Sequence, residues 1–307
     1  MNLRDLEYAE ALARTRHFGE AAAACNISQS TLSIQIKKLE EELGSKLFER
    51  DSRQVLLTDT GTTLLADIKQ ILAAHRGLKD KAAALQNPLA GNLRFGAFPT
   101  LAPYLLPHIM PPLHAALPKV HFQLVEEKTE RLTQQLLEGT LDAALIALPI
   151  TDARLDVFPL FAEPFLLAVS SQSTLARRKR IDLTILKGQQ LLLLDEGHCL
   201  RSQSLEVCTR IGVGESQAYR ATSLETLRHM VAADAGVTLM PALAAEPGTV
   251  TYIPFIPPVP QRDIALVFRS TTARRVLLTE VARTIRSAAK AHPDLKPLAG
   301  GASMRQD

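Results

Sequence analysis

Two cysteines in one short stretch are the residues of this sequence best suited to chemistry. Cys199 and Cys208 lie in GHCLRSQSLEVC, and the chain has one other cysteine, Cys25. His198 precedes the first of the pair, and Arg201 follows it by two positions. Such thiols form a reversible redox pair, bind a metal ion, or fill a core as small apolar residues. A zinc site is the weakest interpretation, because the spacing matches no common finger and no fourth ligand is evident.

The spacing of Cys199 and Cys208 has a geometric consequence if the segment between them is a helix. Nine residues advance roughly 13 Å along a helix axis and turn about 900°, which places the two sulfurs on opposite sides. A disulfide requires Cα atoms within about 7 Å. A bond between these cysteines would therefore require the helix to unravel and to release apolar residues such as Leu200, Leu205 and Val207 from their packing.

Composition is that of an ordinary globular protein with two or three domains. The chain has 307 residues, of which 46% are hydrophobic and 22% charged, and its formal net charge is +3. No apolar run reaches the roughly 18 residues that a membrane span needs, and the charged start MNLRDLEYAEALARTRHFGE is no signal peptide. We therefore expect a cytoplasmic protein without membrane association, in which any disulfide is transient or regulatory.

The first 58 residues have the pattern of a winged helix-turn-helix. Apolar residues recur at helical spacing, and Ser28 suits the N-cap of a helix over 29–42 that Gly44 ends. Two short β-prone runs, 47–50 and 54–57, then predict a hairpin wing.

One face of the helix over 29–42 carries side chains suited to DNA. Hydroxyls and an amide crowd its first turns, where a recognition helix meets base edges, and basic residues of the helix and wing suit phosphates. The candidate DNA-binding residues are Gln29, Ser30, Thr31, Ser33, Lys37, Arg50 and Arg53. A plain solvated face is the alternative. The first 58 residues hold eight Lys/Arg and nine Asp/Glu, so the prediction depends on pattern and not on charge.

A long helix over 59–87 carries an apolar seam, and residues 59–90 are assigned to this linker. The seam steps by four and three residues over three heptads: Leu64, Ile68, Ile71, His75, Leu78, Ala82 and Leu85. A packed core helix can show the same stripe. The length and the polar remaining faces favour a helix that pairs between subunits.

Strand-like and helical runs alternate from Gly91 to residue 293. This βα alternation is typical of α/β domains with largely parallel sheets. The last helix is expected over 275–291. The tail over 294–307 is rich in Gly, Ala, Pro and charged residues, and we expect it to be disordered.

A winged helix-turn-helix, a linker helix and a two-lobed α/β domain together resemble the LysR-type transcriptional regulators. FGEAAAACNISQSTLSIQIKKLEEELGSKLFER is similar to that family's DNA-binding signature. Four further segments are similar to the hydrogen-peroxide-sensing members of the family: FPTLAPYLLPHIMPPLH, GHCLRSQSLEVC, RATSLETLRHMVAADAGVTLMPALA and DIALVFR. The resemblance covers roughly residues 1–290, and the cysteine segment is what selects the peroxide sensors.

The resemblance implies a periplasmic-binding-protein-like regulatory domain over 91–293, with the chain crossing between its lobes near Pro164 and Arg269. It further implies that the protein binds double-stranded promoter DNA, forms a homotetramer as a dimer of dimers, and contacts RNA polymerase. Hydrogen peroxide is the implied signal, and no cofactor or metal is expected.

The resemblance also assigns roles to the cysteine pair. Cys199 is implied to react with peroxide and Cys208 to resolve the product as a disulfide. A helix starting at Cys199 would stabilise a thiolate through its amides and dipole, whereas Asp195 and Glu196 would oppose one. The implied peroxide pocket is formed by Thr100, Thr129, His198 and Arg269.

Two other functions are open. One is a LysR-type regulator that binds a small-molecule effector in the cleft between its lobes, and unreactive cysteines would support it. The other is a thiol peroxidase, but such an enzyme has no use for a DNA-binding domain. We therefore expect a regulator and not an enzyme.

Overall fold

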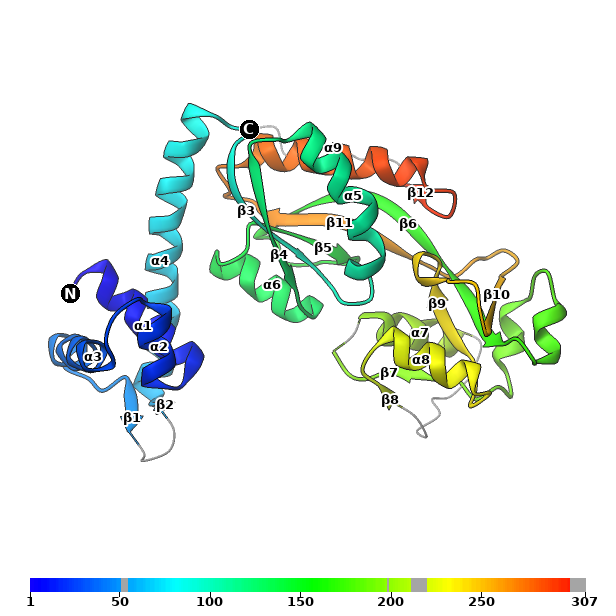
Figure 1. The fold of residues 1–307 in the computed structure, drawn as a ribbon, viewed down its shortest axis with the longest axis horizontal. Coiled ribbons are helices and arrows are strands. Elements are labelled where there is room, and N and C mark those ends of the chain that lie inside the picture. The colour runs from blue at the N-terminus through cyan, green and yellow to red at the C-terminus, as the bar shows by residue number, and fades with distance from the viewer. Residues whose placement is uncertain (51–54, 198, 211–219, 299–307) are drawn as a thin grey trace. The chain divides into compact units, whose positions relative to one another are not determined.

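The chain forms two compact units, residues 1–82 and residues 83–307, which Figure 1 colours from blue at the N-terminus to red at the C-terminus. The computed structural model describes residues 1–50, 55–197, 199–210 and 220–298. Over these ranges, no helix has the length and apolar character needed to cross a membrane.

The first unit is a helix-turn-helix with a two-stranded wing. Its helices are α1 (Leu3–Thr15), α2 (Phe18–Ala24) and α3 (Gln29–Leu43), and α4 (Asp59–Gln86) leads out of it. The wing pairs β1 (Phe48–Arg50) with β2 (Val55–Leu57) in antiparallel register. These elements confirm the winged helix-turn-helix that the sequence predicts.

Local chemistry fixes the ends of these helices. The Asn2 side chain accepts a hydrogen bond from the Asp5 backbone N–H at 3.2 Å, and the Asp5 carboxylate accepts one from the Asn2 N–H at 2.8 Å, which is a capping box. Ser28 Oγ accepts from the Thr31 N–H at 3.1 Å, as expected of the N-cap of α3. Gly44 ends α3 with a φ of 67°, a conformation in which a Cβ is strained.

The apolar seam of α4 divides into two parts. Ile68 of the seam is buried in the core of the helix-turn-helix, together with Leu72, which lies beside the seam. Ile71, Leu78 and Leu85 are exposed, at 44%, 67% and 89%. One part of the seam therefore serves the fold of the first unit. The other part, an outer stripe of Ile71, Leu78 and Leu85, lies on the open surface of the helix.

The second unit is built on one mixed sheet. Its strands follow the order β10-β6-β11-β5-β3-β4, and β9 and β12 also pair with β6. Their bounds are β3 (Gly91–Ala97), β4 (Val120–Glu126), β5 (Ala143–Ala147), β6 (Leu155–Ser170), β9 (Thr238–Pro241), β10 (Val250–Pro254), β11 (Gln261–Arg269) and β12 (Lys296–Pro297). β3 is parallel to β4 and β5, but β11 is antiparallel to β5 and β6. The expectation of largely parallel sheets is wrong here, because β11 returns against the direction in which β6 leaves.

Helices cover both faces of the sheet in the first lobe. α5 (Ala102–Ala116) and α9 (Arg275–Ala291) pack together on one face, and α6 (Thr129–Glu138) lies on the other (Figure 1). Phe95, Leu145 and Val281 are among the fully buried residues of this lobe's core. The predicted helix over 275–291 is confirmed.

The second lobe has its own core around the far half of β6, which pairs there with β9 and β10. β7 (Leu193–Leu194) and β8 (Arg220–Ala221) add a small parallel sheet. The helices of this lobe are η1 (Thr174–Arg177), η2 (Leu183–Leu186), α7 (Cys199–Arg210), α8 (Leu224–Ala232) and η3 (Ala242–Ala244).

The chain crosses between the lobes twice. β6 pairs with β11 as far as Pro164 and with β9 from Phe165 onward, so the first crossing is where it was expected. The second crossing lies between Pro254, the end of β10, and Gln261, the start of β11. The expected crossing near Arg269 is wrong, because the apolar run before Arg269 is the returning strand itself.

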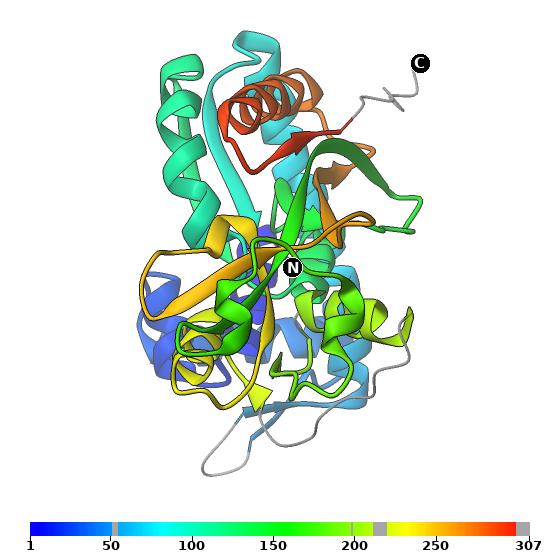
Figure 2. The ribbon, with the colours of Figure 1, turned by 90° about the vertical axis from the view of Figure 1, so that its right-hand side faces the viewer.

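Part of the C-terminal tail is ordered. Lys296 and Pro297 form β12, which pairs with Ala162 and Phe161 of β6 and lies beside α9 (Figure 2). Leu295 is buried. The predicted disorder is therefore wrong for residues 294–298, because this stretch extends the sheet with backbone hydrogen bonds. Residues 299–307 lie outside the described part of the chain.

Candidate functional site

The predicted DNA-binding residues of α3 share one face. Gln29, Ser30, Thr31 and Lys37 are exposed, and Ser33 is half-buried. The hydroxyls of Ser30 and Thr31 lie 2.9 Å and 2.7 Å from Ser28 Oγ, so they form a polar cluster at the start of the helix. Lys37 Nζ is 3.6 Å from Glu41 in an exposed pair, which competes little with a phosphate. Arg53 and the Arg50 side chain lie outside the described residues.

Buried Glu40 fixes the start of the wing, a role that the sequence pattern did not reveal. Its Oε1 accepts hydrogen bonds from the backbone N–H groups of Leu47 and Phe48 at 2.9 Å and 3.1 Å. Lys46 donates to Oε2 at 3.1 Å. This acid therefore positions the wing and is not part of the surface that DNA meets.

Cys199 is the first residue of α7, just after a parallel strand. The strand ends at Leu194, and the loop passes through Gly197 with a φ of 83°, which suits glycine. Lys128 precedes α6 in the first lobe and donates from Nζ to the Glu196 carbonyl at 2.8 Å. Its side chain also lies against Gly197. A first-lobe amine thus holds the second-lobe loop that presents Cys199.

Two threonines and an arginine of the first lobe complete the site around Cys199. Thr100 is buried after β3, and Arg262 of β11 donates from Nη1 to its Oγ1 at 3.0 Å and from Nη2 to its carbonyl at 2.9 Å. Thr129 begins α6, and its hydroxyl is buried without a nitrogen or oxygen partner among the described residues. That hydroxyl and the charge of Arg262 both act on the Cys199 thiol.

Glu163 holds the guanidinium of Arg262, and both side chains are fully buried. Arg262 Nε donates to Glu163 Oε2 at 2.7 Å, and Oε1 accepts from the backbone N–H of Leu243 at 3.0 Å. The guanidinium also lies 5.2 Å from the ring centroid of Phe98. A buried ion pair persists only when its hydrogen bonds are satisfied, and these contacts therefore fix Arg262 in one position.

Burial raises the pKa of the Cys199 thiol above its ordinary value. The positive charge of Arg262, the Thr129 hydroxyl and the backbone amides at the start of α7 lower the pKa in part. The start of α7 stabilises the thiolate as predicted, but burial has the larger effect on the pKa. The upward shift comes from burial and not, as the sequence suggested, from Asp195 and Glu196.

Arg269 contacts the C-terminal end of α6. Its Nη1 donates to the carbonyls of Leu136 and Leu141, the latter at 3.0 Å. It ends β11 seven positions after Arg262, which is roughly 23 Å along a strand and, at an odd spacing, on the opposite face. Arg262 is the arginine whose charge acts on the Cys199 thiol, and the expected place of Arg269 in the peroxide pocket stays a prediction. His198 lies outside the described residues.

Both cysteines belong to one helix, α7, as the sequence predicts. Cys199 is a free thiol, and the side chain of Cys208 is outside the described part of the structure. Leu200 and Val207 are buried in the second-lobe core. Arg201 is buried and donates to a carbonyl of β7 at 3.1 Å. These contacts stabilise the helical form, in which the two cysteines cannot bond.

Sequence reasoning missed Arg262, Glu163 and Lys128. A signal for the first two existed. Glu163 interrupts the apolar run LFAEPFLLAV beside the predicted crossing, and Arg262 lies two positions before the apolar run of β11. Charged residues in strands that pass between lobes are expected to pair when buried. No such signal marked Lys128.

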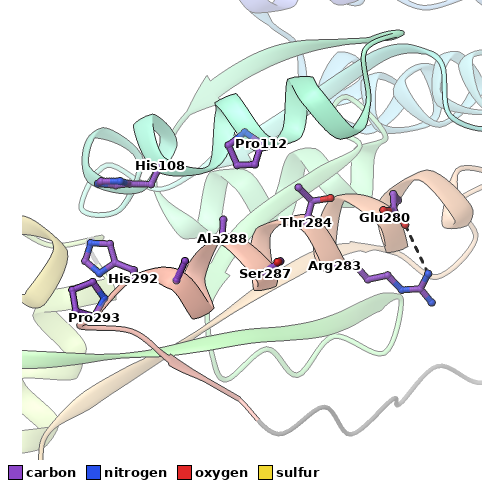
Figure 3. Close-up of a pocket in the computed structure, with 10 residues that line it drawn as sticks. His108, Pro112, Glu280, Arg283, Thr284, Ser287, Ala288, His292 and Pro293 are labelled. Atoms are coloured by element: carbon purple, nitrogen blue, oxygen red, sulfur yellow. Dashed lines mark ion pairs between the residues drawn. The ribbon is translucent and has the colours of Figure 1, made fainter.

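A separate hollow of about 760 Å³ lies between α5 and α9 (Figure 3). His108 and His292 line it with ring centroids 5.2 Å apart, and Arg283 pairs with Glu280 at 3.8 Å. Its described lining includes none of the predicted site residues. Across the part of the chain that the structure describes, no group of three or more His, Cys, Asp or Glu side chains is arranged to hold a metal ion.

Two family models match the two parts of this architecture. The model "Bacterial regulatory helix-turn-helix protein, lysR family" matches residues 3–62, and "LysR substrate binding domain" matches residues 86–290. The first covers the winged helix-turn-helix, and the second covers both lobes. The chain belongs to the LysR family of bacterial transcriptional regulators.

Within that family the chain is similar to OxyR proteins, as the cysteine segment suggests. The "DNA-binding transcriptional dual regulator OxyR" of Escherichia coli K12 is 45% identical over 298 residues, which cover 96% of this chain and 98% of the relative. A full-length C199D OxyR of Pseudomonas aeruginosa has 38% identity and a TM-score of 0.74, over 94% of this chain and 97% of that one. An H2O2-bound OxyR mutant of Corynebacterium glutamicum has 32% identity and a TM-score of 0.65, over 94% and 92%.

Proposed function

We propose that this chain is a transcriptional regulator that senses hydrogen peroxide and controls the genes of the oxidative-stress response. One observation carries the proposal: Cys199 begins a helix, and Thr129 and Arg262 act on its thiol, in a chain that also has a winged helix-turn-helix. Arg262 also holds Thr100. Relatives described as "Hydrogen peroxide-inducible genes activator" support it. A DNA-binding regulator of this family works in the cytoplasm.

The first chemical step is oxidation of Cys199. The thiol loses its proton, and the thiolate sulfur attacks one oxygen of hydrogen peroxide. The O–O bond breaks, and the other oxygen leaves as hydroxide, which takes up a proton to become water. Cys199 becomes a sulfenic acid, so the sulfur is oxidised and the peroxide is reduced.

The second step forms the disulfide. The Cys208 thiolate attacks the sulfur of the sulfenic acid, the S–O bond breaks, and the hydroxyl leaves as a second water after protonation. One peroxide and two thiols thus give one disulfide and two waters. Because both residues lie in α7, the attack requires local melting of that helix.

The residues around Cys199 have separate roles. Arg262 favours loss of the thiol proton, because its positive charge stabilises the thiolate and lowers the pKa that burial raises. The hydroxyls of Thr100 and Thr129 orient the peroxide and donate to the oxygen that leaves. His198 is assigned to the same pocket because it directly precedes Cys199 in the sequence.

Oxidation of the two cysteines of α7 alters transcription by changing the contacts between subunits. The refolded segment shifts subunit contacts in a homotetramer, a dimer of dimers that the outer stripe of α4 helps to pair. The four DNA-binding domains then change position on double-stranded promoter DNA, which changes recruitment of RNA polymerase. Gln29 and Thr31 read base edges, and Lys37, Arg50 and Arg53 contact phosphates.

Sub-stoichiometric peroxide distinguishes this function from the alternatives. The full-length protein and its Cys199→Ser, Cys208→Ser and Cys25→Ser variants are treated, and intact mass and the DNA footprint are measured in parallel. We expect wild type and Cys25→Ser to lose two hydrogens and change their footprint. Cys208→Ser should gain one oxygen at Cys199, and Cys199→Ser should stay unmodified.

An unmodified Cys199 under conditions that switch DNA binding would falsify the proposal. That outcome would favour a regulator whose effector is a small molecule in the cleft between the lobes. Continuous consumption of excess peroxide without any change in DNA binding would instead indicate a thiol peroxidase.

A further inference from the structure

Residues 177–180 are four consecutive cations, Arg177, Arg178, Lys179 and Arg180, and all four are exposed. We name them the basic turn. They run from Arg177, the last residue of η1, toward η2 in the second lobe, in the green segment that follows β6 in Figure 1. The peroxide site does not involve them, and no part of the proposed mechanism explains so concentrated a charge.

The segment around the basic turn has a larger net positive charge than the whole protein. Residues 171–190 hold five basic residues and one acidic residue, a net charge of +4, whereas the complete chain carries +3. The rest of the chain therefore sums to −1. The first 58 residues also sum to −1, so the helix-turn-helix has little overall attraction for a polyanion.

The backbone holds the basic turn in place at both ends. Ser173 caps η1 by accepting from the Leu175 N–H at 3.2 Å, and the Arg178 N–H donates to the Leu175 carbonyl at 2.9 Å. Buried Ile181 donates its N–H to the Pro254 carbonyl at 3.1 Å, and its own carbonyl accepts from the N–H of Ile256 at 2.8 Å. A ligand that binds the turn therefore has little backbone to order.

The part of the chain that the structure describes supplies no acid that pairs with the basic turn. Among the described residues, none of the four side chains forms an ion pair. The nearest acid in sequence, Asp182, caps η2 by accepting from the Thr184 N–H at 2.8 Å. Hydrogen bonds from Thr184 lower the pKa of Asp182, so this carboxylate stays committed to its own helix.

We propose that the basic turn binds backbone phosphates of double-stranded DNA and so adds a second, sequence-independent contact to that of the helix-turn-helix. Four adjacent cations match the regular negative charge of a duplex, and each phosphate contact releases counterions. The helix-turn-helix keeps DNA at high local concentration around the regulatory unit of the same chain. The turn reads no bases, because a short run of flexible cations makes no directional contact with base edges.

Salt dependence of DNA binding tests this. The full-length variant Arg177→Gln, Arg178→Gln, Lys179→Gln and Arg180→Gln is compared with a control that loses the same charge elsewhere in the regulatory unit. The control changes four exposed residues: Lys119→Gln, Arg131→Gln, Lys290→Gln and Lys296→Gln. Affinity for one selected binding site, on duplexes with short and long flanks, is measured across a range of KCl concentrations with both proteins reduced.

We expect the basic-turn variant to lose affinity at low salt and to show a shallower plot of log affinity against log salt. The slope should fall by about 0.9 for each phosphate that the turn no longer neutralises, and the reduction in affinity should be larger on the long flanks. The control variant should keep the wild-type slope. Matching thermal unfolding of the three proteins excludes misfolding, because every substituted residue is exposed.

Equal slopes for the two variants would overturn the proposal. If the slopes are equal but the basic-turn variant activates transcription poorly with purified RNA polymerase, the turn meets an acidic protein surface and DNA is the wrong partner. The salt titration uses reduced protein without peroxide, so its failure is separate from any failure of the peroxide chemistry, whereas the transcription assay uses the peroxide-treated form.

Discussion

Arg262 contributes both to the buried polar contacts of the fold and to the pKa of Cys199. Its guanidinium contacts Thr100 and Glu163, and its charge lowers the pKa of Cys199 against the effect of burial. Removing one partner of a buried ion pair leaves the other charge uncompensated. The electrostatic role of Arg262 is therefore best tested by neutralising both partners together.

The double substitution Glu163→Gln with Arg262→Gln should slow the reaction of Cys199. It removes the positive charge that opposes desolvation, so the pKa of the thiol should rise further above its ordinary value. Because only the thiolate reacts, alkylation by iodoacetamide near neutral pH should fall several-fold, and its pH profile should move to more alkaline pH.

The single substitution Glu163→Gln should have the opposite effect on the pKa of Cys199. It leaves Arg262 charged without its counter-charge, so the thiolate gains stabilisation and the pKa of Cys199 should fall. Alkylation should then be faster than in wild type. If both variants slow alkylation to the same extent, Arg262 serves only to support the fold around Cys199.

The sequence predicted the reacting residues of this site better than the residues that support them. Thr129 acts on the Cys199 thiol, and Thr100 is bonded to Arg262, whose charge acts on the same thiol. Arg262 was missed because strand parity was not applied to β11, and the role of Arg269 stays a prediction. Glu163 was missed because the burial of a carboxylate depends on a partner distant in the chain.

At the scale of one element, the packing of α7 opposes formation of a disulfide between its two cysteines. Leu200 and Val207 pack in the second-lobe core, and exposing each costs about 1.5–3 kcal/mol. Arg201 adds a buried hydrogen bond to β7. On the proposed mechanism, formation of the Cys199–Cys208 disulfide must offset these losses, so the reduced helix and the oxidised segment would be two alternative structures of one sequence.

Hydrogen exchange of the backbone amides should detect the unravelling of α7. In the reduced protein the amides of residues 203–207 are hydrogen-bonded within α7 and should be protected. After treatment with peroxide we expect these amides to exchange faster, while those of α8 stay unchanged. The Cys208→Ser variant, treated in the same way, should keep its protection. A disulfide-linked wild type with full protection in α7 would contradict the requirement for unravelling.

Periodicity predicted some elements well and others poorly. The helices α7 and α9 and the wing follow the predicted ranges closely, because their patterns are local. The direction of β11 and the pairing of β12 with β6 were not predicted, because both depend on which strands meet across the sheet. Short strands carry little periodicity of their own.

At the scale of the whole molecule, the divided seam of α4 separates folding from assembly. Ile68 serves the core of the first unit, whereas Ile71 is 44% exposed on the outer stripe. Two residues of one heptad pattern therefore have different functions. Substitutions at the two positions should affect different measurements.

The substitution Ile71→Asp should weaken self-association without unfolding the first unit. A charge placed in an apolar helix interface is strongly unfavourable when the partner helix buries it. Sedimentation velocity should show smaller species at a given concentration, with an unchanged Tm. Ile68→Asp should instead lower the Tm, since it buries a carboxylate in the core.

Gln70→Asp is the matched control, because Gln70 is exposed and adjacent to Ile71 but lies off the outer stripe. It should leave both sedimentation and Tm as in wild type. An unchanged assembly in Ile71→Asp would mean that the outer stripe does not pair subunits.

The location of both cysteines in one twelve-residue helix also bears on how long the proposed response would last. A helix of this size re-forms within about a microsecond once its chain is free. Reduction or exchange of a disulfide takes seconds to hours. On the proposed mechanism, the return of α7 to its reduced form is therefore limited by thiol chemistry and not by folding, and we expect the duration of gene activation to follow the supply of reductant in the cell.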